Sequence, residues 1–253
     1  MKQLRVGLCF DAGIPVLGTI STSFKSDDDV VFPELFDGGY AALNSGAVPH
    51  RFHDPIIQQF KTASKEFSLT CIAGSTSFQR GESPATNTSL VFSRGRLIHR
   101  YDKIHLFKPT GDHHFFAGGR TVRTFTFPFG SRRIKAGVVI CYDLRFPELI
   151  REMALQGIQI LFVPARWPKS RDDAWRTLLK ARAIENQLFA VGCNAFGTEG
   201  GYSYAFDPGG RMIFSNRQRP RSRKGSFSVD LRRLDAARQI HRNIEDAVLL
   251  KKR

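Results

Sequence analysis

The 253-residue chain has only four cysteines, and no two of them form a Cys-x-x-Cys pair. This number and spacing exclude a disulfide-built scaffold and favour reduced thiols, as in a cytoplasmic protein. No apolar run approaches the ~18 residues that a membrane-spanning helix needs. Residues 1–10 hold no long apolar segment before a cleavage site, so we expect no signal peptide.

Acidic residues are also scarce, because 23 Asp and Glu stand against 38 Lys and Arg, a net charge of +15. A charge of this size permits affinity for nucleic acid or an anionic surface. The most basic run, residues 217–224, has no interleaved Tyr or Phe to stack on bases, and no nucleic-acid motif is present. We interpret the run as a solvated hairpin loop and expect no nucleic-acid partner. The charge can also steer carboxylate substrates toward the protein.

The remaining composition suits one domain over residues 1–253, because 42% of the residues are hydrophobic and 22 are Phe. Strand-like and helix-like segments alternate along the chain. Asp54 and Pro55 mark one helix start, Gly157 marks the end of another helix, and Asp172 or Asp173 caps a third. The pattern predicts a layered α/β architecture without giving the number of sheets.

Residues 138–149 read Val-Val-Ile-Cys-Tyr-Asp-Leu-Arg-Phe-Pro-Glu-Leu and carry the strongest chemical signal. An apolar, strand-like run ends at Cys141, and a helix start follows almost at once. A thiol on such a strand-to-helix turn can be held as a nucleophilic thiolate by helix-end amides and a nearby cation. The alternative is a buried structural cysteine, which is the commoner role of a free thiol.

Two further segments favour the nucleophile. Glu34 ends a short Phe-Pro-closed strand, and Lys103 lies within Tyr-Asp-Lys-Ile-His-Leu-Phe. Alone, either residue would be a turn residue or a solvated charge. Glu34, Lys103 and Cys141 in this order, 69 and then 38 residues apart, resemble the Glu-Lys-Cys pattern of the nitrilase superfamily of carbon–nitrogen hydrolases. Segments 164–168, 181–187 and 207–210 extend the resemblance over nearly the whole chain.

The resemblance implies a four-layer α-β-β-α sandwich that forms homodimers or higher homo-oligomers, with the tail at about 231–253 packed on the neighbour. It also implies that Glu34 is the general base and Lys103 the oxyanion cation. Cys141 would be the nucleophile, and the backbone N–H of Tyr142 a second oxyanion donor. The family often has a second glutamate after the lysine segment. The matching residue here is Asp112, which can still orient Lys103 unless a water fills the gap.

Asp112, His113 and His114, with His105 nearby, raise the question of a metal site. No spacing such as His-Glu-x-x-His supports one. We therefore expect neither a metal nor a cofactor.

The Cys141 motif most resembles the omega-amidase branch, which releases ammonia from omega-amides of dicarboxylic acids. Arg145 can face a substrate carboxylate or pair with Glu148. Arg166 stands where that branch often has Asn, which adds a cation beside the pocket, and Trp167 is expected to form a wall. The alternatives are deaminated-glutathione amidase, N-carbamoyl amino acid amidohydrolase, or a catalytically weak binding or assembly protein that keeps the fold.

Overall fold

The computed structural model describes residues 3–11, 15–24, 28–219 and 221–248. Its strands are β1 (Leu4–Cys9), β2 (Asp29–Val31), β3 (Thr70–Ile72), β4 (Thr76–Phe78), β5 (Thr86–Ser93), β6 (Arg96–Asp102), β7 (Phe125–Phe129), β8 (Arg132–Val138), β9 (Ile160–Ala165), β10 (Phe189–Asn194), β11 (Tyr204–Phe206), β12 (Met212–Ser215) and β13 (Lys224–Val229). Its α-helices are α1 (Val16–Ser23), α2 (Gly39–Asn44), α3 (Pro55–Glu66), α4 (Asp112–Phe115), α5 (Pro147–Leu155), α6 (Asp172–Asn186) and α7 (Arg232–Ile240).

The strands form two mixed sheets. The first has the order β13-β1-β2-β3-β5-β4, and β6 also pairs with β5. In it, β1, β2 and β3 are parallel, whereas β13 and β5 run antiparallel to their neighbours. The second sheet has the order β12-β11-β10-β9-β8-β7, with β8, β9 and β10 parallel. The parallel strands are buried almost throughout, as expected of strands covered on both faces.

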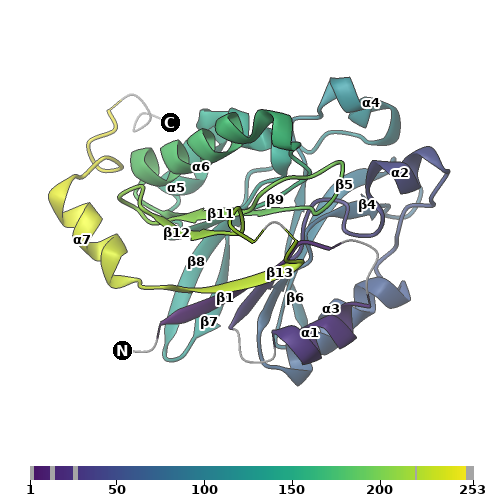
Figure 1. Cartoon of the computed structure of the whole chain (residues 1–253), viewed down its shortest axis with the longest axis horizontal. Helices are drawn as coiled ribbons and strands as arrows, with labels where there is room; N and C mark the ends of the chain where they lie inside the picture. The colour runs from purple at the N-terminus through teal and green to yellow at the C-terminus, as the bar shows by residue number, and fades with distance from the viewer. Residues whose placement is uncertain (1–2, 12–14, 25–27, 220, 249–253) are drawn as a thin grey trace.

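Helices cover the outer face of each sheet and complete four layers (Figure 1). Helices α1 and α3 lie on the first sheet, and α5 and α6 lie on the second. Ile57, Phe60 and Ala63 recur at helical spacing in α3 and are fully buried against the first sheet. Trp175 and Leu179 of α6 do the same on the second sheet. The predicted α/β four-layer sandwich is confirmed.

The helix start predicted at Asp54 and Pro55 is confirmed, although the Asp54 carboxylate accepts from the Arg51 N–H and His50 rather than from the helix. Two local predictions were wrong. The basic residues 217–224 do not form a hairpin, because β12 before them and β13 after them belong to different sheets; residue 220 lies outside the described residues. Asp172 opens α6 without capping it, because its carboxylate accepts from the Tyr204 hydroxyl.

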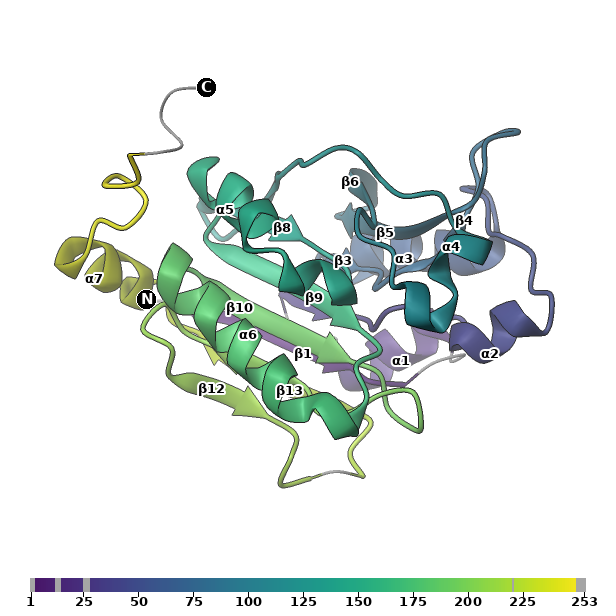
Figure 2. The same cartoon turned by 90° about the horizontal axis from the view of Figure 1, so that it is seen from above.

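The topology brings distant parts of the chain to one edge of the sandwich. Glu34 follows β2, Lys103 follows β6, and Cys141 follows β8 three residues after that strand ends. Figure 2 shows α2 and α4 close together at one side of the molecule. Clefts in α/β sheets form where the carboxyl ends of neighbouring strands meet, so this edge is where a site is expected. Among the described residues, no helix is both long and apolar enough to cross a membrane.

Candidate active site

Cys141 lies on a strained turn between β8 and α5. Its φ is +48°, in the left-handed region that residues with a Cβ rarely adopt, and it opens a 3₁₀ helix over Cys141–Arg145. This conformation costs roughly 1–2 kcal/mol and persists only where the surroundings enforce it. Within the described residues the backbone N–H of Tyr142 donates to no acceptor. The turn thus presents a thiol next to an unused backbone donor.

The turn is enforced from behind by the buried carboxylate of Asp143. Its Oδ2 accepts from the Tyr101 hydroxyl at 2.7 Å and from the Ile140 N–H at 3.1 Å, and its Oδ1 accepts from the His105 N–H at 2.8 Å. The His105 ring bonds the same oxygen at 2.9 Å. Arg182, from α6, donates twice to the carbonyl of Leu144. His105 therefore supports the turn as a hydrogen-bonding partner of Asp143.

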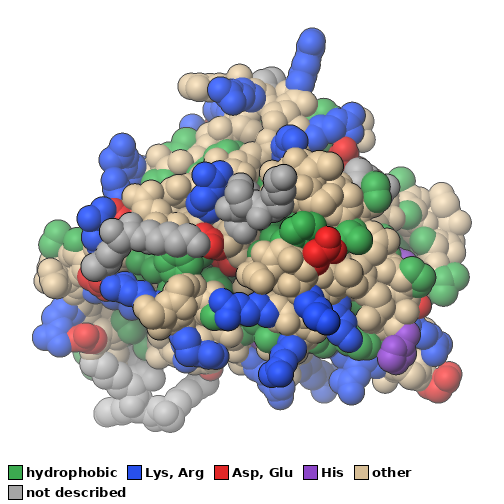
Figure 3. All heavy atoms as spheres, turned by 90° about the horizontal axis from the view of Figure 1, so that it is seen from below, with side chains coloured by type: hydrophobic (Ala, Val, Ile, Leu, Met, Phe, Trp, Pro, Cys, Tyr) green, Lys and Arg blue, Asp and Glu red, His purple; other side chains and the backbone are tan. Residues whose placement is uncertain are grey.

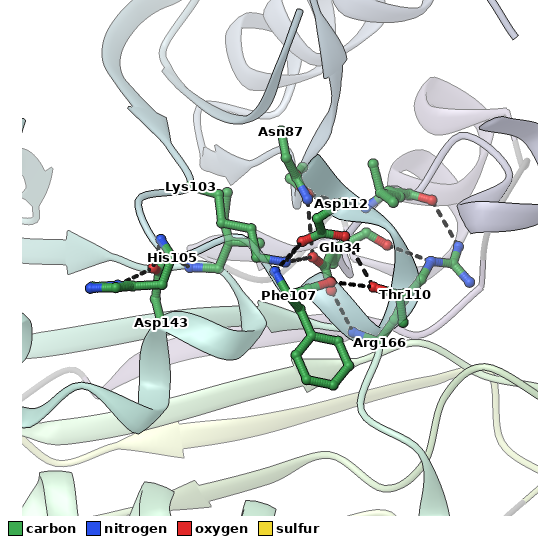
Figure 4. A network of polar contacts seen from close by, with 12 residues as sticks. Glu34, Asn87, Lys103, His105, Phe107, Thr110, Asp112, Asp143 and Arg166 are labelled. Atoms are coloured by element: carbon green, nitrogen blue, oxygen red, sulfur yellow. Dashed lines mark hydrogen bonds and ion pairs between the residues drawn. The ribbon is translucent and has the colours of Figure 1, made fainter. Parts of the chain in front are cut away.

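Lys103 is fully buried and lies between two carboxylates, as Figure 4 shows. Its Nζ is 2.8 Å from Glu34 Oε1 and 2.7 Å from Asp112 Oδ2, and both acids are fully buried as well. Burial alone would lower the pKa of Lys103, but the charges of Glu34 and its neighbours raise that pKa well above its ordinary value. The ammonium group is therefore permanently charged at this site.

Glu34 is held by groups from three other segments. Its Oε1 accepts from Asn87 Nδ2 at 3.0 Å, in addition to Lys103, and its Oε2 accepts from the backbone N–H of Arg166 at 3.0 Å. Asn87 comes from β5 and Arg166 follows β9. These bonds fix both oxygens of the carboxylate, so Glu34 has one well-defined position.

Asp112, at the position where the resemblance implies a second glutamate, contacts Lys103 directly. Its carboxylate also accepts from the Tyr40 hydroxyl at 2.6 Å, the Phe107 N–H at 2.9 Å and the Thr110 hydroxyl at 3.2 Å. Burial would raise the pKa of Asp112, but the Lys103 charge and these hydrogen bonds together lower it. Asp112 is therefore an ionised partner that fixes the ammonium group.

The Cys141 thiol lies among the same groups. Burial and then the Glu34 charge raise its pKa well above the ordinary value, and a hydrogen bond with the Glu34 side chain raises it further. Lys103 and the backbone N–H of Arg166 act on the same sulfur in the opposite direction without prevailing. The charge of Glu34 and the loss of water outweigh the Lys103 cation, so the pKa of the thiol is raised rather than lowered. The sulfur carries its proton and has a base beside it.

The sulfur opens onto a cavity of about 330 Å³. Cys141 and Lys103 line it, together with Tyr142, Arg145 and Trp167. The Arg145 guanidinium lies 4.9 Å from the centre of the Trp167 ring, and within the described residues it forms no ion pair, with Glu148 or any other acid. Trp167 is 4% exposed and forms a wall. An exposed, unpaired guanidinium is thus available to a ligand in the cavity.

Arg166 also lines the cavity, but its guanidinium is committed to the protein. It donates to the backbone carbonyls of Glu34 at 2.8 Å and Leu35 at 2.7 Å, and to Glu199 Oε2 at 3.0 Å. Gly39, with φ +70°, permits this approach, because a Cβ there would lie 2.6 Å from the Arg166 Cζ. Arg166 therefore ties the segment that carries Glu34 to the loop after β10.

Sequence reasoning missed several contributors to this geometry, above all Asn87 and Tyr40. Asn87 comes from β5 and Tyr40 from α2, and neither lies in a recognisable pattern. Within the part of the chain that the structure describes, no three His, Cys, Asp or Glu side chains gather as a metal site would require.

Comparisons with known proteins agree with this geometry. The family model described as carbon-nitrogen hydrolase matches residues 28–239. The chain is 32% identical to the 2-oxoglutaramate amidase of Bacillus subtilis (77% of this chain, 75% of the relative) and 35% identical to an omega-amidase of Escherichia coli (74% and 71%). It is 34% identical to a deaminated glutathione amidase of Yersinia enterocolitica (70% and 68%). A Saccharomyces cerevisiae structure from branch 10 of the nitrilase superfamily superposes with a TM-score of 0.80 at 22% identity, covering 99% of this chain and 96% of that one.

Proposed function

The chain belongs to the carbon–nitrogen hydrolase family, in the omega-amidase-like branch of the nitrilase superfamily, and we propose that Glu34, Lys103 and Cys141 are its catalytic triad. The relatives named as amidases support amidohydrolase activity. The proposal adds a substrate class, small carboxylated omega-amides, and a route through a thioester. The observation that carries it is the buried Lys103 ammonium, bonded to Glu34 beside the Cys141 sulfur.

The first half of the reaction uses the neutral thiol. As Cys141 Sγ forms a bond to the amide carbon, Glu34 takes the thiol proton, so no free thiolate need accumulate. The carbonyl oxygen becomes an oxyanion that accepts hydrogen bonds from Lys103 Nζ and the backbone N–H of Tyr142. The carbon–nitrogen bond then breaks, Glu34 gives its proton to the departing nitrogen, and ammonia leaves a thioester on Cys141.

The second half returns the enzyme to its starting state. Glu34, again ionised, takes a proton from water as the water oxygen attacks the thioester carbon. Lys103 and the Tyr142 N–H hold the second oxyanion as they hold the first. The carbon–sulfur bond breaks, the sulfur recovers the proton from Glu34, and the carboxylic acid product departs.

The cavity supports an anionic substrate of modest size. Its volume is about 330 Å³, and the Arg145 guanidinium stands unpaired within it. A guanidinium suits a carboxylate because it can donate two parallel hydrogen bonds. We therefore assign the carboxylate of the omega-amide to Arg145 and the hydrophobic wall to Trp167, while Asp112 orients Lys103. Relatives acting on 2-oxoglutaramate support this class.

Deaminated glutathione is the second candidate substrate, supported by the similarity to an amidase of that name. N-carbamoyl amino acids are a third candidate, whereas a catalytically weak binding protein would turn over none of these compounds. A panel of omega-amides, deaminated glutathione and N-carbamoyl amino acids, assayed by product release, separates the four cases. We also propose that the protein is a cytoplasmic homodimer or larger homo-oligomer and that it needs no cofactor.

The test is ammonia release from 2-oxoglutaramate by the purified chain. The parent should turn over the substrate, and Cys141→Ala should not. The control Cys71→Ala, which removes a thiol in β3, should retain turnover. Iodoacetamide should label Cys141 alone, because Cys9, Cys71 and Cys193 are at most 1% exposed. Equal rates in the parent and Cys141→Ala would refute the mechanism, and an unlabelled Cys141 with no turnover would favour a binding protein.

A further inference from the structure

The basic residues 217–224 lie against the loop that follows β10, near the active-site cavity. The Arg223 guanidinium is 4.9 Å from the Phe196 ring centre, and the Arg217 guanidinium is 5.8 Å from the Tyr202 ring centre. Lys169 approaches the Tyr202 ring at 5.5 Å. The run predicted to be simply a solvated loop therefore places cations beside two aromatic residues of the loop over residues 196–202.

These residues border a second hollow, of about 570 Å³, which we call the basic groove. Pro168, Lys169, Phe196, Tyr202 and Arg221 line it, with the glycines of the 196–202 loop. No acidic residue contributes to the lining. Lys169 and Arg221 are exposed, and neither forms an ion pair within the described residues. The groove thus carries two positive charges that the described protein does not neutralise.

The basic groove adjoins the active-site cavity. Pro168 lines both hollows. Glu199 faces the cavity, whereas its neighbours Thr198 and Gly200 face the groove. The two hollows therefore lie next to each other at Pro168 and at residues 198–200.

The charges along both hollows favour an anion. Arg145 and Arg171 line the cavity without an ion pair in the described part of the chain, and Arg171 lies 5.2 Å from the Phe107 ring centre. The acid of this lining, Glu199, is neutralised by Arg166. Figure 3 shows a similar excess of Lys and Arg over Asp and Glu on one face of the molecule. Cations exposed along a cleft attract anionic ligands and select among them.

We propose that the basic groove is a subsite for a carboxylate-bearing tail of an amide substrate that is longer than the cavity, with Lys169 and Arg221 as its recognition residues. This inference rests on the proposed amidohydrolase function, because the cavity must hold the scissile amide while the groove holds the tail. The tail can extend from the acyl side or from the amine side of the amide, and the substrates of the test distinguish the two.

The test compares four amides in the parent and in the double variant Lys169→Ala/Arg221→Ala. Glutaramate is short, glutaryl-glycine has a charged tail on the amine side, glutaryl-glycinamide has the matching neutral tail, and suberamate lengthens the acyl side. The control Lys61→Ala/Arg133→Ala removes the same charge from exposed residues of α3 and β8. This control variant corrects for the change in the overall electrostatic field of the protein.

The double variant should raise KM about fivefold to tenfold for a charged-tail amide, with kcat unchanged, since two exposed cations each contribute modestly. KM for glutaramate and glutaryl-glycinamide should change less than twofold. Whichever of glutaryl-glycine and suberamate responds identifies the side that enters the groove. Equal changes for all four amides, or none for either long anion, would overturn the proposal.

A chain without amidase activity leaves the groove testable by calorimetry. The same amides would be titrated into the parent, the double variant and the control. Weaker binding of charged-tail amides by the double variant alone would support the groove. The lack of turnover would then count against the proposed function only. Binding that is equal in all three proteins, or undetectable even in the parent, would refute the groove itself.

Discussion

At the scale of single residues, Asp112 stands where the family resemblance implies a longer carboxylate. It is fully buried and its Oδ2 is 2.7 Å from Lys103 Nζ, and we propose that it fixes the ammonium while Glu34 is left to exchange protons. The shorter side chain is compensated by the backbone, because the Phe107 N–H and the Tyr40 hydroxyl hold the carboxylate near the lysine.

Asp112→Asn is expected to lower kcat by about 10²-fold, because Lys103 loses a charged partner and shifts from the oxyanion position. The matched change Tyr40→Phe removes one hydrogen bond and leaves Asp112 on Lys103, so it should cost no more than about tenfold. Steady-state ammonia release from 2-oxoglutaramate measures both. Activity of Asp112→Asn within threefold of the parent would contradict the assigned role.

Arg166 offers a sharper distinction, because the sequence predicts that it binds substrate and its contacts favour positioning. Arg166→Met removes the guanidinium bonds to the carbonyls of Glu34 and Leu35 and to Glu199, while keeping the backbone N–H on Glu34. A positioning role predicts a fall in kcat of about 10–100-fold, a displaced acidic limb of the pH profile and little change in KM.

The conservative variant Arg166→Lys separates geometry from charge. Lysine carries the charge on a single nitrogen and cannot reach three acceptors at once, so we expect it to resemble Arg166→Met. Full recovery by lysine would show that charge alone matters. A rise in KM at constant kcat in Arg166→Met would instead support the substrate-binding role.

The contrast between Cys141 and Asn87 shows what the sequence could reveal. The Cys141 turn is local, since an apolar strand, a reactive residue and a helix start follow one another within a dozen residues. Asn87 is an ordinary residue of a buried strand, and its bond to Glu34 exists only because β5 lies in the same sheet as β2. The local sequence could not predict the charge state of the thiol either, because that state depends on burial and on the position of Glu34.

At the scale of elements, contacts of His50 hold the segment between α2 and α3 in place. Its ring lies 3.1 Å from Asp37 and 3.1 Å from Asp54, and its backbone bridges to β4 through Ser77. The hydrogen bond with Asp37 is the main reason that the pKa of His50 is raised, and Asp54 adds to it, against the opposing effect of burial. Asp37 belongs to the same turn as Glu34, so these contacts of His50 also support the side of the first sheet that carries the candidate active site.

A raised histidine pKa stabilises the fold while the ring is charged. That stability is fully present below the unfolded value of about 6.5 and is lost as the pH rises through the higher folded pKa. The melting temperature should therefore fall by roughly 2 °C above pH 6.5 in the parent, a loss of about 0.5–1 kcal/mol in a chain of this size. His50→Gln should remove this fall in melting temperature. His53→Gln changes an exposed neighbour and should leave the fall unchanged. The same fall in His50→Gln as in the parent would contradict its assignment to His50.

The sequence predicted some helices and strands better than others. Helical spacing predicted α3, α5 and α6, because each buries one clear face. Short elements such as β4 and α2 carry too few residues for a period to show, and their positions depend on β5 and on the loop after β2. The basic residues 217–224 were misplaced because nothing in a turn sequence tells whether the chain returns to the same sheet or crosses to the other.

At the scale of the whole molecule, a single domain over 1–253 and packing of the 231–253 tail on a neighbour stay predictions. The described part of the tail contacts its own chain, since Gln187 at the end of α6 donates to the carbonyls of Ala237 and His241. Residues 249–253 lie outside the described residues. Helix α7 is thereby placed beside the end of α6.

The outer face of α5 and α6 is where we expect the second copy to bind. Leu155 is 37% exposed and Ile184 is 43% exposed, and these apolar side chains belong to the two helices that cover the second sheet. A stable dimer buries on the order of 1,600 Å² in total, with its apolar residues at the centre. Burying Ile184 against its own copy would remove apolar surface that a lone chain leaves in water.

Ile184→Lys is therefore expected to convert the dimer to a monomer in sedimentation equilibrium, because two like charges would face each other across the two-fold axis. Val48→Lys is the matched control, since Val48 is 79% exposed on the segment between α2 and α3, away from this face. It should sediment as the parent does. Far-ultraviolet circular dichroism of both variants would show whether each chain remains folded. A folded Ile184→Lys protein that stays dimeric would place the interface elsewhere, and a monomeric parent would remove the homodimer from the proposed function while leaving the triad within each chain untouched.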